Sequence, residues 1–168
     1  MPEIIKADFH CAEHGAAIVS LLDEYASGPM GGMSPLSDYT RRHLVGKLAS
    51  RQNAHALLAF QDGESAGLAI CFEGFSTFAC HPLLNLHDFM VSQRFQGQGI
   101  AKRLLAAVDE LALSLACCKV TLEVLEGNHV ARALYIKKKM GYAGYELDVD
   151  TGAAMFWQKS LSSNSRLS

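Results

Sequence analysis

Residues 86–105 have the sequence LHDFMVSQRFQGQGIAKRLL, in which an apolar run passes through a polar, glycine-bearing segment into apolar residues at helical spacing. We expect a strand over residues 85–91, a glycine turn over residues 93–99 and a helix from Ile100. Such a turn leaves the first backbone N–H groups of the helix without intrahelical partners. With the positive end of the helix dipole, these groups favour phosphate binding. The sequence therefore predicts an anion site where this helix begins.

Two common nucleotide-binding motifs do not fit this turn. The Rossmann fingerprint needs a third glycine, and position 102 holds Lys102 instead. The P-loop needs Gly-Lys-Ser/Thr after a four-residue gap, which is absent here. Gly97 and Gly99 still allow the backbone to approach an anion closely, because neither carries a Cβ. On their own, however, the two glycines are equally compatible with a tight turn that has no ligand.

The remaining elements follow from hydrophobic periodicity and turn residues. Strands are expected over residues 3–7, 54–61, 66–72, 119–125, 142–147 and 154–159, with an irregular segment over 75–82. Helices are expected around the stripe from Ile18 to Tyr25, after an N-cap at Ser37, over 100–115, and from Asn128 to Gly141. The order β-α-α-β-β-β-α-β-α-β-β predicts an α+β fold with one central sheet of about seven strands and four helices.

Composition narrows the class of protein. A chain of 168 residues with 49% apolar and 19% charged residues fits one domain, expected over residues 1–161, with a disordered polar tail over 162–168. The net charge of -2 argues against a nucleic-acid or anionic-membrane partner. No apolar run approaches the roughly 18 residues of a membrane span. The N-terminus lacks a signal-peptide pattern and the cysteines are odd in number, so we expect a cytoplasmic protein with reduced thiols.

Two motifs at a fixed separation carry a family resemblance. The segment from Arg94 to Ala101 matches an Arg/Gln-x-x-Gly-x-Gly/Ala turn, and residues 122–142 combine a strand, an Asn-x-x-Ala-x-x-Leu-Tyr helix and a Gly-aromatic ending. Both resemble the GNAT superfamily of N-acetyltransferases, over residues 86–142 in motif and nearly the whole chain in element order. The resemblance implies the GNAT fold, a mostly antiparallel twisted sheet that splays between its fourth and fifth strands.

The resemblance also implies a cosubstrate, acetyl-CoA. Its diphosphate would rest on backbone amides in the glycine turn, its pantetheine arm would run along the main chain of the preceding strand, and the later helix would approach it from the other side. The residues so implicated are Phe89, Met90, Val91, Arg94, Gly97, Gln98, Gly99, Ile100, Ala101, Lys102, Asn128 and Ala131. For Asn128, a plain helix N-cap is the alternative, and both roles are compatible.

Three residues are candidate catalytic residues: Tyr135, His87 and Asp88. Tyr135 resembles the family's general acid, since a phenol with a pKa near 10 is protonated at neutral pH and can donate to a leaving thiolate; an ordinary core tyrosine is the alternative. The segment from Asn85 to Val91 resembles the diamine and polyamine acetyltransferase branch, with His87-Asp88 where that branch has Glu-Asp. A histidine titrates near neutral pH, so His87 is the candidate base, with a hydrogen-bonded strand residue as its alternative.

The resemblance therefore predicts acetyl transfer to a primary amine of a small molecule, of the diamine, polyamine or amino-acid-like kind, by a homodimeric enzyme. Loss of the branch's glutamate weakens the polyamine assignment, although Asp88, Glu73 or Glu24 could supply the negative charge. A protein-amine acetyltransferase and a non-catalytic CoA sensor remain as alternatives. The string His-x-x-Glu-His over residues 10–14 matches a zinc-protease pattern, but no third ligand is evident and no metal is expected. The loop over residues 27–35 is either an acceptor-side lid or a simple connection.

Overall fold

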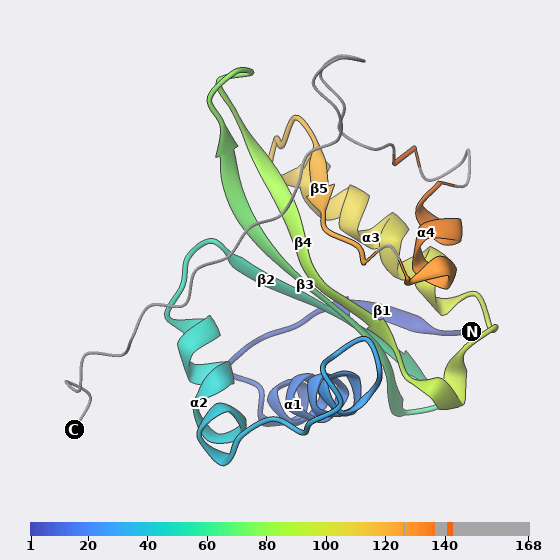
Figure 1. Cartoon of the computed structure of the whole chain (residues 1–168). Coiled ribbons are helices and arrows are strands. Elements are labelled where there is room, and N and C mark those ends of the chain that lie inside the picture. Colours follow the sequence, from blue (N-terminus) through green and yellow to red (C-terminus); the bar gives the residue numbers. More distant parts are fainter. Residues whose placement is uncertain (126, 137–140, 143–168) are drawn as a thin grey trace. The chain divides into compact units, whose positions relative to one another are not determined.

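The computed structural model describes residues 1–125, 127–136 and 141–142 (Figure 1). Residues 1–132 form one compact unit and residues 133–168 a second, and each is described by itself. The strands are β1 (Glu3–Lys6), β2 (Ala54–Gln61), β3 (Glu64–Ser76), β4 (His81–Val91) and β5 (Val120–Leu122). The helices are α1 (Ala12–Ser27), α2 (Asp38–Ala49), the 3-10 helix η1 (Gln93–Phe95), α3 (Ile100–Ser114) and α4 (His129–Tyr135).

The five strands form one sheet in the order β1-β2-β3-β4-β5. The first four strands pair antiparallel, whereas β5 pairs parallel to β4. Two parallel neighbours need a crossover connection, and α3 supplies it. Between β2 and β3, Asp62 and Gly63 have φ of 54° and 83°, the left-handed pair that a two-residue hairpin turn requires, and the predicted hairpin is confirmed.

One face of the sheet is covered by α1 and α2 (Figure 1). The predicted stripe of α1 faces it, with Ile18, Leu21 and Leu22 buried against alternate residues of the central strands. In α2 the side chain of Ser37 accepts a hydrogen bond from the Thr40 amide at 3.1 Å, which confirms the predicted N-cap.

The opposite face is covered by α3, which contacts β1 to β4. The residues of α3 that face the sheet recur at helical spacing and are buried: Ile100, Leu104, Leu105, Val108, Leu111 and Ala112. Because helices cover both faces, the first six residues of β2 are all buried, giving a nearly continuous apolar run rather than an alternating one. The sheet therefore offers open backbone only at its ends and edges.

Several predicted boundaries were wrong. The segment 75–82 was expected to be irregular, but β3 extends to Ser76 and β4 begins at His81, so only a short turn separates them. The strand expected over 119–125 is confined to Val120–Leu122. The five strands described fall short of the seven expected, because the predicted hairpin over 142–147 and 154–159 lies outside the described residues apart from Tyr142.

Within the part of the chain that the structure describes, no helix combines the length and the apolar character that crossing a bilayer requires.

Candidate active site

The centre of the candidate site is the point where β4 and β5 part. The two strands pair only from Leu84 opposite Val120 to Leu86 opposite Leu122. Beyond this point β5 ends, while β4 continues to Val91 along its other neighbour, β3. The splay expected between the fourth and fifth strands is therefore present. The predicted pantetheine contacts, from Phe89 to Val91, all lie on the part of β4 that extends past β5.

A β-bulge shapes β4 at the same place. Leu86 lies opposite Cys71 and Asp88 lies opposite Ile70, so His87 is an extra residue with no residue of β3 directly across from it. Directly paired residues project to the same face, so Asp88 shares the α1-facing side with Ile70, which belongs to that core.

His87 projects to that side too. Its ring lies edge-on to Phe72, with 5.4 Å between centroids, and Phe72 packs against the same core. The bulge thus gives two consecutive polar side chains one common face.

The carboxyl of Asp88 is electrostatically unusual. Burial raises its pKa above the ordinary value of 3.8, and the nearby His87 offsets this in part. The pKa of Tyr25, in the last turn of α1, is also raised, first by burial and then by the charge of Asp88. Tyr25 therefore lies within electrostatic range of Asp88. Its position on the apolar stripe of α1 indicates only core packing, so the sequence alone gives no sign that Tyr25 lies near the site.

The predicted anion site is a turn with left-handed glycines. Gly97 has φ 77° and Gly99, the N-cap of α3, has φ 80°. Glycine adopts this conformation readily and has no side chain to cap the helix. A Cβ built on either residue would meet no atom within 4 Å, so the space in front of the turn is open. The first backbone N–H groups of α3 point out of the N-terminal end of the helix, where they can bind an anion.

The turn is braced by its own side chains. Gln96 donates to the Val91 carbonyl at 3.3 Å, and Gln98 donates to the Arg94 carbonyl at 3.4 Å. Among the predicted coenzyme ligands, Ile100 has its side chain in the core, so only its backbone can face the turn, whereas Lys102 is exposed and Ala101 half-buried.

Arg94 is engaged elsewhere. Its guanidinium forms a bidentate pair with Glu64, at 2.6 and 3.1 Å, on the protein surface. Hydrogen bonding to Glu64 and the charge of that carboxylate raise the pKa of Arg94 further. A coenzyme contact by this side chain stays a prediction.

The residues predicted on the later helix occupy its two ends. The Asn128 side-chain oxygen accepts from the Ala131 amide at 3.1 Å, so the N-cap interpretation is confirmed. Tyr135 is the last residue of α4 and belongs to the second unit, where its ring lies 5.5 Å from that of Tyr142. Gly141 has φ 70°, a left-handed backbone, but α4 ends at Tyr135 and residues 137–140 lie outside the described residues, so the prediction that Gly141 ends this helix stays a prediction. The catalytic role of Tyr135 stays a prediction.

Two other candidates for charge near His87 have different roles. Glu73 lies opposite Leu84, on the α3-facing side, and accepts a bond of 2.7 Å from His55. Glu24 accepts a hydrogen bond from the Gln93 amide at 2.9 Å. Only Asp88 of the three therefore shares the face of His87 on β4.

The His-x-x-Glu-His string has a local structural role. The ring nitrogen Nδ1 of His14 accepts a hydrogen bond from the Asp8 amide at 3.0 Å, and the His10 amide donates to the Asp8 carboxylate at 2.8 Å. Among the described residues, no group of three or more His, Cys, Asp or Glu side chains is arranged to hold a metal ion.

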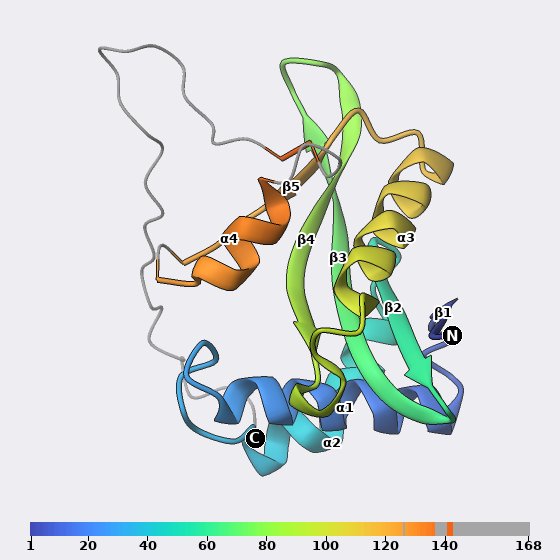
Figure 2. The same cartoon turned by 90° about the vertical axis from the view of Figure 1, so that its right-hand side faces the viewer.

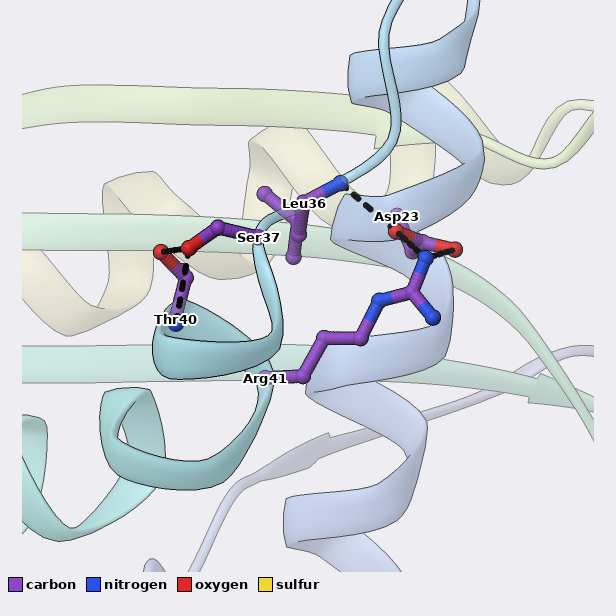
Figure 3. Close-up of polar contacts among 5 residues, drawn as sticks. All are labelled: Asp23, Leu36, Ser37, Thr40 and Arg41. Carbon is purple, nitrogen blue, oxygen red and sulfur yellow. Dashed lines mark hydrogen bonds and ion pairs between the residues drawn. The ribbon is translucent and has the colours of Figure 1, made fainter.

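The loop over residues 27–35 is anchored to α1. The Asp23 carboxylate accepts from the Leu36 amide at 2.8 Å and pairs with the Arg41 guanidinium at 2.9 and 3.1 Å (Figure 3). The Ser34 amide also donates to the Ala26 carbonyl at 3.1 Å. A shallow hollow of about 520 Å³ near Asp23 and Arg41 lies on the side of α1 that faces away from the sheet. None of the predicted site residues lines it.

Known proteins resemble this chain in sequence and in fold. Residues 17–142 match the sequence model of the Acetyltransferase (GNAT) family. A 50-residue segment is 40% identical to an uncharacterized N-acetyltransferase, YycN, of Bacillus subtilis (strain 168), a match that spans 30% of this chain and 32% of that protein.

Two solved structures share the fold at low identity. One is an aminoglycoside acetyltransferase, meta-AAC0020, from an uncultured soil metagenomic sample, in complex with sisomicin; it has a TM-score of 0.73 and 16% identity, over 95% of this chain and 97% of that one. The other is AAC(6')-Iy in complex with a bisubstrate analog, CoA-S-monomethyl-acetylneamine, with a TM-score of 0.72 and 17% identity over 96% and 99%. Since the family match covers most of the described sheet, the strand divergence and the glycine turn, the chain belongs to the acetyltransferase (GNAT) family of acetyl-CoA-dependent acyltransferases.

Proposed function

We propose that this enzyme transfers the acetyl group of acetyl-CoA to a primary amine of a small cationic molecule, a diamine, a polyamine or an amino-acid-like amine. The observation that carries the proposal is the β-bulge in β4. It puts a histidine and a carboxyl on one face of the strand that leads to the glycine turn. A proton acceptor and a negative charge are what an ammonium substrate needs, because it must be bound as a cation and then lose a proton before it can attack.

The chain fits the coenzyme at two places. The open space in front of Gly97 and Gly99 supports binding of the diphosphate by the amides from Gly97 to Lys102. The continuation of β4 past the end of β5 supports a pantetheine arm along the main chain of Phe89, Met90 and Val91. Asn128 and Ala131 are proposed to contact the coenzyme from α4, in addition to forming its N-cap.

When bound, acetyl-CoA supplies a thioester that the amine attacks directly, without an acyl-enzyme. We assign His87 as the base that takes the proton of the attacking amine, directly or through water. We assign to Asp88 the binding of the cationic acceptor. Burial raises the pKa of Asp88, which means that its charged form is less stable than that of an exposed aspartate. A bound ammonium therefore stabilises charged Asp88 more than it would stabilise an exposed aspartate. Tyr135 would return a proton to the sulfur of the departing CoA.

A panel of amines tests the acceptor class. Release of the CoA thiol is measured with diamines, polyamines, amino acids, aminoglycosides and short peptides at equal concentration. We expect turnover with the small cationic amines and little with peptides. Turnover with peptides alone would indicate that the acceptor is an amine of a protein. Tight binding of CoA with no turnover on any amine would favour a sensor.

A further inference from the structure

One hydrogen bond joins α1 to the entrance of the glycine turn. The Glu24 carboxylate, in the last turn of α1, accepts from the backbone N–H of Gln93 at 2.9 Å. Gln93 is the first residue of η1, which follows β4 and leads into the turn. The two residues are 69 positions apart in the chain. Figure 2 shows the turn after β4 lying beside α1.

The bond meets a local need of the turn. The first N–H groups of a short helix have no partner within it and are usually satisfied by a side chain just before it. The residue before η1, Ser92, makes no such side-chain bond. Glu24 accepts from the first N–H of η1 instead, and a bond to a charged acceptor is stronger than one between neutral groups.

We infer that Glu24 is a positioning residue for the coenzyme: by fixing the Gln93 amide, it holds the turn in the shape that presents the amides from Gly97 to Lys102 to the diphosphate. The inference rests on the proposed function of that turn. Glu24 itself need not touch the coenzyme. The neighbouring residue, Tyr25, is the one that lies near Asp88, so a single turn of α1 supports both the coenzyme turn and the acceptor face.

The charge of Glu24 acts in the opposite sense to its hydrogen bond. A carboxylate near an anion site repels the anion, and Glu24 is close enough to Arg94, in the same turn, to be one of the lesser contributors that raise the pKa of Arg94, after Glu64. The hydrogen bond should therefore strengthen coenzyme binding while the charge weakens it. Two substitutions of Glu24 separate these effects. One keeps the negative charge on a side chain too short to reach the Gln93 amide, and the other keeps a hydrogen-bond acceptor but has no charge.

The test compares Glu24→Asp, which keeps the charge on a side chain one methylene shorter, with Glu24→Gln, whose amide oxygen can still accept from Gln93. Binding of CoA to the folded full-length protein is measured by calorimetry. We expect the Kd to rise about tenfold in Glu24→Asp and to equal or fall below that of the unsubstituted protein in Glu24→Gln. The matched control is Glu110→Asp, an exposed glutamate on α3, which should leave the Kd unchanged.

Two further readouts exclude a general loss of structure. The Tm of Glu24→Asp should stay within a few degrees of the control, and the KM for the amine should change less than that for acetyl-CoA. Equal Kd values in Glu24→Asp and the control, or equal weakening in Glu24→Asp and Glu24→Gln, would overturn the inference. Failure of the unsubstituted protein to bind CoA would instead contradict the proposed function of the turn, so the two failures are distinguishable.

Discussion

The side chains of His87 and Asp88 project from the same face of the sheet although they are consecutive residues of β4. Neighbouring strand residues normally alternate between faces, and a bulge at His87 removes the alternation at this one place. The face they share is the one covered by α1. Such a pair can combine a proton acceptor with a fixed negative charge, which is the basis of the first two predictions.

The first prediction concerns His87 as the base. His87→Gln keeps a polar side chain of similar length. Unlike histidine, glutamine cannot titrate between pH 5 and 9. We expect kcat/KM to fall by about 10² to 10⁴, and the rise of rate with pH near neutrality to disappear. The measurement is a pH–rate profile of both proteins with a saturating acetyl donor. A variant that retains the same rise at the same pH would exclude His87 as the base.

The second prediction concerns the burial of Asp88. Its folded-state pKa is raised, so the protonated carboxyl stabilises the fold fully below the ordinary value of 3.8, and this contribution is lost as pH rises through the folded-state pKa. Asp88→Asn carries no charge at any pH. We therefore expect the variant to be more stable than the unsubstituted protein at pH 7 and equally stable at pH 3.

Thermal unfolding at several pH values measures this difference. The same substitution should raise the KM for a cationic amine far more than the KM for acetyl-CoA. A stability difference that does not change with pH would show that the carboxyl is not destabilised by burial, and an unchanged amine KM would remove Asp88 from acceptor binding.

The third prediction concerns Tyr135. Tyr135→Phe removes only the hydroxyl, so packing of the ring is retained. If the phenol protonates the leaving thiolate, kcat should fall by about 10² to 10⁴ with little change in either KM. Steady-state kinetics with both substrates varied provides the values. The control is Tyr142→Phe, the ring beside Tyr135 in the second unit, which should leave kcat within about threefold. A Tyr135→Phe enzyme of normal turnover would contradict the assignment.

The fourth prediction concerns the link between α1 and α2. Asp23 holds the Leu36 amide and the Arg41 guanidinium together, with exposed side-chain fractions of 30% for Asp23 and 41% for Arg41 (Figure 3). An ion pair this exposed contributes about 0 to 1 kcal/mol, whereas a bond from a backbone amide to a carboxylate contributes about 1.5 to 3 kcal/mol. Asp23→Ala should therefore reduce the free energy of unfolding by about 2 kcal/mol. Arg41→Gln, which removes only the ion pair, should cost less than about 1 kcal/mol.

Urea unfolding of the two variants gives both values. Equal losses would mean that the ion pair, and not the bond to Leu36, holds the loop to α1.

Local sequence patterns predicted the elements that depend on residues close together in the chain. The stripes of α1 and α3, the Asp62-Gly63 hairpin, the Ser37 and Asn128 caps and the left-handed glycines of the turn are all present. In each case the physical cause lies within a few residues: periodicity, a capping oxygen or a required positive φ. The family resemblance added the divergence of β4 and β5.

Features that depend on pairing over long distances could not be predicted. Residues 75–82 were expected to be irregular, yet cross-strand pairing of Gly74 with Leu83 and of Phe75 with Pro82 extends both strands into this segment. The bulge at His87 depends on the register of β3 against β4. The bond between Glu24 and Gln93 joins two segments whose proximity exists only after α1 packs on the sheet.

We propose above all that the amides from Gly97 to Lys102 bind the diphosphate of the coenzyme. Calorimetric titration of CoA into Gly99→Asp and Gly99→Asn tests it most directly, because both side chains tolerate the left-handed backbone and have almost the same size, while only aspartate is charged. We predict saturable binding to the unsubstituted protein, and a Kd at least tenfold higher for Gly99→Asp than for Gly99→Asn. Equal Kd values for the two variants, or no heat of binding with the unsubstituted protein, would contradict the account.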